Sequence, residues 1–133
     1  MKTKLTEMFG IEYPIVQSGM QGYVDSRGVA DIDKRDEYVA YGDKVIKAVI
    51  GLTNKPYIVN ISLAPTQRLD NEEIRKTIRL CGEKHVAAIE TSAEDPREFI
   101  ADIKSAGMRH FHKCPNYKVS MSMERKGLDG VII

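Results

Sequence analysis

The sequence predicts an α/β fold in which parallel strands alternate with helices, as in part of a (β/α)₈ barrel. Apolar strands are expected to start near residues 86, 108 and 130, about 22 residues apart, and a glycine precedes each of the last two. Such a repeat is typical of right-handed βαβ units in a parallel sheet. Because a complete barrel takes roughly 250 residues, we expect residues 1–133 to form one partial barrel domain, truncated before closure.

The middle of the chain supplies the first clear strand and helix. Residues 56–63 are rich in β-branched and aromatic side chains, which predicts a buried strand. Asp70 stands three residues before Glu73, a spacing that predicts a capping box at the start of a helix. That helix is expected to end near Gly82, and residues 86–90 form the next strand.

Two further helix-and-strand units follow. Pro96 is suited to the first turn of a helix that Gly107 ends. Residues 108–112 predict a strand, and Asn116 is placed to cap a helix that runs to Gly127. The last strand then covers the apolar residues from 130 onward.

The first half of the chain is less regular. Residues 13–17 predict a strand, and the glycines of residues 18–22 predict a turn after it. Residues 43–53 fit a helix with one apolar face. Between them, residues 23–41 carry mixed charges with weak periodicity, which favours a solvated helix or loop without a site.

Composition excludes several classes of function. The formal net charge is +1, so nothing indicates binding to nucleic acid or to an anionic membrane. No apolar run reaches the length of a membrane helix, and the N-terminus has no signal-peptide pattern. The only two cysteines, Cys81 and Cys114, lack C-x-x-C spacing. We therefore expect a cytoplasmic protein with neither disulfides nor a zinc site.

Candidate functional residues gather where strands end, because ligands of parallel α/β folds bind beyond the carboxyl ends of strands. Each also has a structural explanation. The glycines could simply form the turn, Asn60 could be a buried polar residue bonded to backbone, and Lys113 could be solvated. His110 and His112 share a strand face, but without a third ligand at a recognisable spacing no metal site is predicted. The candidates are Gln17, Gly19, Met20, Gly22, Asn60, Glu90, His112 and Lys113.

Several motifs, in order, resemble one enzyme family. They are L-T-E-M-F-G-I-E-Y-P-I-V-Q-S-G-M-Q-G (5–22), G-L-T-N-K-P-Y-I-V-N-I-S-L (51–63), A-A-I-E-T-S (87–92), A-G-M-R-H-F-H-K-C (106–114) and E-R-K-G-L-D-G-V-I-I (124–133). Together they cover about four-fifths of the chain. The pattern resembles the N-terminal part of the nitronate monooxygenases, also called 2-nitropropane dioxygenases.

The resemblance implies an FMN-binding barrel that oxidises alkyl nitronates with O₂ to a carbonyl compound and nitrite. It implies flavin contacts from the backbone at Gly19, Met20 and Gly22 and from the side chains of Asn60 and Lys113. A fixed lysine charge suits anionic reduced flavin and an anionic nitronate. In the same way, Gln17, Glu90 and His112 would be supporting pocket residues.

The chain also departs from the family pattern. Residues 23–41 have no counterpart of the family's alanine-rich helix and G-G-L-G stretch, and N-Y-K-V-S (116–120) replaces an S-V-R-H-A-like opening. The family's catalytic histidine and phosphate-binding glycine loops would lie beyond Ile133, so we expect this chain alone to bind flavin weakly.

Two alternatives remain. One is a flavin-dependent enoyl-acyl-carrier-protein reductase, which shares the P-I-x-Q-x-G-M motif but more often has an apolar V-V-P-like stretch where this chain has His112-Lys113. The other is a non-catalytic, truncated remnant that associates with further copies through the open edges of its sheet.

Overall fold

A computed structural model of the chain describes residues 2–15, 55–65 and 69–133. The chain divides into two compact units, Met1–Asp31 and Ile32–Ile133. In the first unit, helix α1 (Lys4–Phe9) begins with a capping box between Thr3 and Thr6 and ends at Gly10, whose φ is 63°. No helix within the described ranges is long and apolar enough to cross a membrane.

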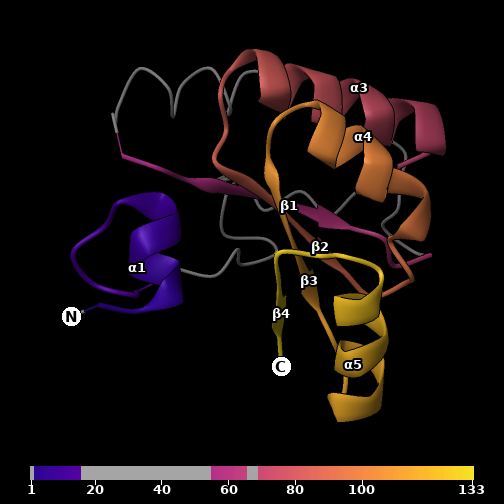
Figure 1. Cartoon of the computed structure of the whole chain (residues 1–133). Helices are drawn as coiled ribbons and strands as arrows, with labels where there is room; N and C mark the ends of the chain where they lie inside the picture. The colour runs from indigo at the N-terminus through magenta and orange to yellow at the C-terminus, as the bar shows by residue number, and fades with distance from the viewer. Residues whose placement is uncertain (1, 16–54, 66–68) are drawn as a thin grey trace, which may run out of the picture. The chain divides into compact units, whose positions relative to one another are not determined.

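The second unit contains a parallel sheet in the order β1-β2-β3-β4 (Figure 1). Its strands are β1 (Ile58–Ser62), β2 (Ala88–Ser92), β3 (Arg109–Lys113) and β4 (Gly130–Ile132). Each strand pairs with the next along the chain, so every crossover joins neighbouring strands. This strand order is that of a (β/α) barrel wall, in which each helix returns the chain to the adjacent strand.

Helices connect the strands as the sequence predicts. Asp70 and Glu73 form the expected capping box of α3 (Asn71–Glu83). The chain between β2 and β3 forms a 3₁₀ turn, η2 (Arg97–Phe99), and then α4 (Ile100–Ser105). The side chain of Asn116 caps α5 (Tyr117–Arg125) by accepting from the backbone N–H of Val119.

The three described helices that connect the strands, α3, α4 and α5, cover the same face of the sheet, which we call the helix face. Ile61 of β1 and Ile89 of β2 belong to one buried cluster with side chains of α3, η2 and α4. Val131 of β4 packs in a second cluster with Met123 of α5. Figure 1 shows α3 and α4 running side by side over the strands. Coverage of one face by α3, α4 and α5 is typical of a barrel wall rather than of a sheet sandwiched between helix layers.

Some predicted boundaries are corrected by the structure. The strand expected at 86–90 lies at Ala88–Ser92, and the one expected at 108–112 lies at Arg109–Lys113. Pro96 is the N-cap of the 3₁₀ turn rather than a residue of the first α-helical turn.

In the first half, the described residues 13–15 are not a strand, so the prediction at 13–17 is wrong there. The predicted turn at 18–22, the charged segment 23–41 and the helix at 43–53 lie outside the described residues.

Candidate functional site

Three of the predicted site residues meet on the face of the sheet opposite the helices. The amide nitrogen Nδ2 of Asn60 donates to Oε1 of Glu90 at 2.9 Å. The ammonium Nζ of Lys113 lies 2.9 Å from the same oxygen. One carboxylate oxygen therefore binds an amide and an ammonium at once, and we call these three residues the Asn60–Glu90–Lys113 cluster.

The sheet register brings the cluster together. Asn60 of β1 is directly beside Glu90 of β2, and parallel neighbours in register point to the same face. Lys113 is paired with Ser92, two residues further along β2, so it shares that face and its long side chain returns to Glu90. Ile61 and Ile89, which alternate with these residues, point into the helix-covered core.

Burial differs sharply within the cluster. The Glu90 side chain is 6% exposed, whereas that of Lys113 is 40% exposed, and Asn60 is also exposed. A buried carboxylate needs partners that satisfy its charge, and the Asn60 amide and the Lys113 ammonium supply them. The buried Glu90 carboxylate thus holds the Asn60 and Lys113 side chains in position, and these two side chains are accessible to a ligand.

Phe111 and Gly130 form the neighbouring part of the same face. Phe111 is in register with Glu90 on one side and with Gly130 on the other. A Cβ atom on Gly130 would stand 2.6 Å from Cε1 of the Phe111 ring. The absence of a side chain at Gly130 therefore lets the nearly buried aromatic ring lie against β4, beside the cluster.

A second polar network lies on the helix face. The hydroxyl of Thr91 is 2.9 Å from Nε2 of His110 and 2.9 Å from Nδ1 of His112. All three side chains are essentially inaccessible to water, and among the described residues Nδ1 of His110 has no hydrogen-bond partner. The network is enclosed between sheet and helices, so its position favours a structural role.

Burial sets the protonation of these histidines. Desolvation, with a smaller contribution from His112, lowers the pKa of His110 to about 4. Desolvation also lowers the pKa of His112, an effect that Asp95 partly opposes and Lys126 reinforces. Both imidazoles are therefore neutral at neutral pH, and neither offers a positive charge to a ligand.

The structure unites some of the predicted site residues and separates others. Asn60, Glu90 and Lys113 are brought together, whereas His112 lies on the opposite face of β3, because adjacent strand residues alternate between faces. Sequence reasoning overlooked Thr91 as the hydroxyl between the two histidines, although His110 and His112 were correctly assigned to one face. The remaining candidates, Gln17, Gly19, Met20 and Gly22, lie outside the described residues.

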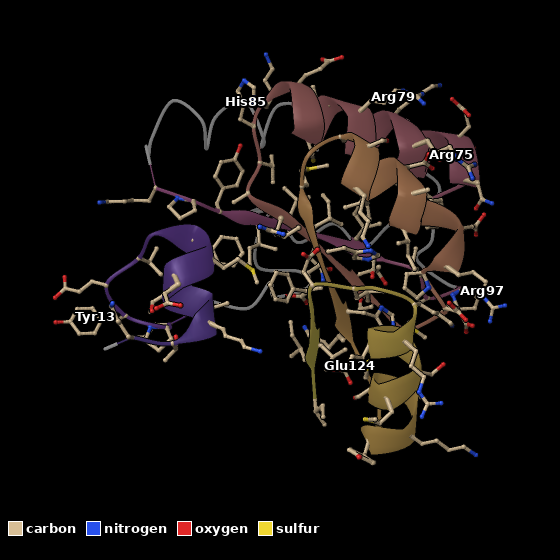
Figure 2. All side chains as sticks on the ribbon, viewed as in Figure 1. Tyr13, Arg75, Arg79, His85, Arg97 and Glu124 are labelled. Carbon is tan, nitrogen blue, oxygen red and sulfur yellow. The ribbon has the colours of Figure 1, made fainter. Side chains whose placement is uncertain are left out.

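Other surface features do not add to this cluster. A shallow groove of about 430 Å³ runs between α3 and α4, on the helix side of the sheet, and is lined in part by Arg75, Arg79 and Asp102. Figure 2 labels Arg75 and Arg79 on α3. Arg75 is already paired there with Asp102 at 3.0 Å. No group of three or more His, Cys, Asp or Glu side chains suited to a metal ion occurs in the part of the chain that the structure describes.

Comparison with known proteins places this arrangement in context. No protein-family model matches the chain. A probable nitronate monooxygenase from Staphylococcus haemolyticus is 30% identical over 80 residues, which are 53% of this chain and 22% of that protein. The (3aS,4S,5R,7aS)-5-hydroxy-7a-methyl-1-oxo-octahydro-1H-indene-4-carboxyl-CoA dehydrogenase of Rhodococcus jostii is 25% identical over 142 aligned residues, covering 100% of this chain and 38% of that protein.

The solved structure of FabK from Thermotoga maritima confirms the fold class. It superposes with a TM-score of 0.72 at 24% identity, over 98% of this chain and 43% of FabK. The chain thus spans less than half the length of each of these proteins. The fold is a parallel α/β segment of the TIM-barrel type. The two curated relatives bear the names of oxidoreductases, a probable nitronate monooxygenase and a dehydrogenase.

Proposed function

We propose that this chain supplies one wall of the FMN site of a nitronate monooxygenase, which oxidises alkyl nitronates with O₂ to carbonyl compounds and nitrite. The observation that carries the proposal is the convergence of Asn60, Glu90 and Lys113 on one face of three adjacent parallel strands. The similarity to a probable nitronate monooxygenase supports it.

The donor set of the cluster fits a flavin. An exposed amide and a partly exposed ammonium stand beside each other on a rigid sheet, which suits the carbonyl and ring-nitrogen edge of a planar heterocycle. When bound, FMN supplies the electron acceptor for nitronate oxidation. Lys113 would hold a fixed positive charge near the reduced flavin and the nitronate, which are both anionic.

The residues around this cluster complete the proposal. Gly19, Met20 and Gly22 would lay backbone against the flavin, with Gln17 as a supporting residue, by resemblance to the family. Glu90 would hold the two contacting side chains in place, because its carboxylate is buried between them. His112 would support the wall from the helix face rather than enter the pocket.

A second candidate is a flavin-dependent enoyl-acyl-carrier-protein reductase. Two comparisons favour this reductase as a candidate. The fold is similar to that of FabK, and the whole chain is similar in sequence to a dehydrogenase. The two activities differ in their products. A nitronate monooxygenase releases nitrite from alkyl nitronates and O₂, whereas an enoyl reductase consumes a reduced nicotinamide and an enoyl thioester. Assaying the flavin-loaded protein for nitrite release and for nicotinamide oxidation therefore separates the two candidates.

Flavin binding by the chain tests the proposal at the level of the site. We expect FMN to bind weakly but saturably, as followed by quenching of its fluorescence during titration. Lys113→Met should weaken binding by at least about tenfold, because it removes a charged donor worth about 1.5–3 kcal/mol when partly shielded from water. Lys118→Met, at an exposed position on α5, is the matched control and should bind as the original chain does. Equal affinity in the Lys113 and Lys118 variants would refute the proposed site.

A further inference from the structure

The Thr91 hydroxyl contacts more groups than its single proton can serve. Its oxygen Oγ1 lies 2.9 Å from Nε2 of His110, 2.9 Å from Nδ1 of His112 and 3.4 Å from the backbone oxygen of Phe111. A hydroxyl donates one hydrogen bond and accepts two, whereas a neutral imidazole donates one and accepts one. The 3.4 Å contact is too long for a good O–H···O hydrogen bond, so the hydroxyl proton goes to one of the two imidazoles.

The surroundings of His110 decide which imidazole receives that proton. Nδ1 of His110 is buried and, among the described residues, has no hydrogen-bond partner. If Thr91 donated to Nε2 of His110, the ring proton would have to sit on Nδ1 as a buried N–H without an acceptor, and such groups are rare in proteins. His110 therefore donates from Nε2 to Thr91, and Thr91 donates to Nδ1 of His112. The ring proton of His112 is then on Nε2 as well.

This network joins two neighbouring strands on the helix face. Thr91 belongs to β2, and both histidines belong to β3, where Phe111 and Lys113 alternate with them toward the opposite face. The backbone N–H of His110 also donates to the Asp129 carboxylate at 2.9 Å, which attaches this part of β3 to the residue before β4. A change that broke the network would therefore loosen β3 together with the side chains on both of its faces.

A second proton would have different consequences on the two rings. On His112 it would go to Nδ1, which would then donate to Thr91, and the hydroxyl could turn toward the backbone oxygen of Phe111. On His110 it would go to Nδ1, where no described residue accepts a hydrogen bond. The network can thus accommodate a charge on His112 but not on His110.

Charged groups from the surrounding segments act on both rings. Asp129 favours a proton on His110, whereas Lys104 of α4 and a proton on His112 oppose it. Asp95 favours a proton on His112, whereas Lys126, 2.7 Å from the Asp95 carboxylate, opposes it. Burial outweighs both carboxylates and lowers the pKa of both histidines, that of His110 to about 4.

We propose that the Thr91–His110–His112 network is an acid-sensitive switch, which joins β2 to β3 while His110 is neutral and releases β3 when Nδ1 of His110 takes up a proton. The switch goes beyond the proposed flavin site and does not depend on it. His112 takes up its proton first and leaves the network closed, because Thr91 can reverse its hydrogen bond to this ring.

NMR of the ring nitrogens in the original chain, labelled at histidine, tests the assigned hydrogen bonds. At neutral pH we expect Nε2 of both His110 and His112 to show the shift of a protonated nitrogen, and both Nδ1 atoms that of an unprotonated one. His85 is exposed, so its nitrogens should show the average of the two forms and serve as the internal reference. A protonated Nδ1 on either buried ring would overturn the assigned direction of the network.

Two substitutions at Thr91 form a matched pair. Thr91→Val replaces the hydroxyl by a methyl group of similar size, so His112 should show averaged nitrogens like those of His85. The pH at which β3 is released should rise by about one unit, because hydrogen bonds made only in the neutral state are lost. Thr91→Ser keeps the hydroxyl and should behave as the original chain does. Equal behaviour of the two variants would contradict the role of the hydroxyl.

An acid titration of the original chain tests the release itself. The ring nitrogens and the backbone amides of β3 are followed in the same samples. We expect His112 to become protonated while the β3 amides keep their native signals, and protonation of His110 to coincide with the loss of these signals. In His110→Gln the signals should persist to a pH about one unit lower. Protonation of His110 with unchanged β3 amides would overturn the switch, as would loss of these signals at the same pH in both proteins.

Discussion

His110 couples the stability of the fold to pH. Its folded-state pKa is lowered to about 4 from an ordinary value of 6.5. Between these values the unfolded chain binds a proton that the folded chain does not, so stability is complete above about pH 6.5 and falls as the pH falls. Each pH unit in this window should cost about 1.4 kcal/mol of unfolding free energy from this group, and the lowered pKa of His112 acts in the same direction.

Urea unfolding at a series of pH values between neutrality and the His110 pKa measures this slope. His110→Gln has no titrating group at the position, so its unfolding free energy should fall less steeply as the pH is lowered. His85→Gln is the matched control, because His85 is exposed on the loop after α3 (Figure 2). Parallel pH profiles for the original chain and His110→Gln would contradict the prediction.

Individual site residues could be predicted from sequence in type but not in every orientation. Asn60, Glu90 and Lys113 were predicted as a polar edge of parallel strands, and the structure brings all three together. His112 was grouped with Lys113 because the two residues stand at the expected end of the strand at 108–112. Since β3 extends through Lys113, the two neighbours instead alternate between faces. A difference of one residue at the strand end, together with the alternation of faces, separates these two side chains.

At the scale of elements, side-chain caps were the most dependable signals. Asp70 with Glu73 and Asn116 mark helix starts where the structure has them. Helix α1 was overlooked, because its capping box uses Thr6 rather than a glutamate or glutamine and six residues show no apolar period. The 3₁₀ turn before α4 was likewise not predictable from Pro96, which suits the beginning of either helix type.

The contact between β3 and β4 depends on a residue without a side chain. Gly130→Ala would place a Cβ atom 2.6 Å from Cε1 of Phe111, so the ring has to move. Because Phe111 is in register with Glu90, the displaced ring is expected to press toward the cluster. We predict a loss of about 1–3 kcal/mol in unfolding free energy, typical of overpacking, measured by urea denaturation.

A second substitution shows whether the clash itself causes that loss. Phe111→Leu removes the aromatic atoms nearest to the added methyl group. The double variant of Gly130→Ala with Phe111→Leu should therefore be more stable than the sum of the two single effects predicts. Additive effects would mean that Gly130 is required for a reason other than its contact with Phe111.

The arrangement of the whole sheet was only partly contained in the sequence. The 22-residue repeat predicted parallel strands, but the same repeat is compatible with helices on one face or on both. What decides between them is the strand order β1-β2-β3-β4 with α3, α4 and α5 on a single face. Strand order depends on contacts between distant segments, which local patterns do not encode. The fold likeness to FabK agrees with the barrel-type order.

Cooperative unfolding of the sheet unit depends on the centre of its core. Ile89 in β2 is fully buried among side chains of the neighbouring strand and helices, so Ile89→Ala should lower the unfolding free energy by about 2–5 kcal/mol. That is a large share of the roughly 5–15 kcal/mol that stabilises a typical domain. Ile133→Ala, at a side chain that is 79% exposed, should change it by no more than about 0.5 kcal/mol.

Urea unfolding followed by far-ultraviolet circular dichroism and by tyrosine fluorescence should give coincident transitions. A small effect of Ile89→Ala, or separate transitions for helix content and tyrosine environment, would show that sheet and helices are not one cooperative unit.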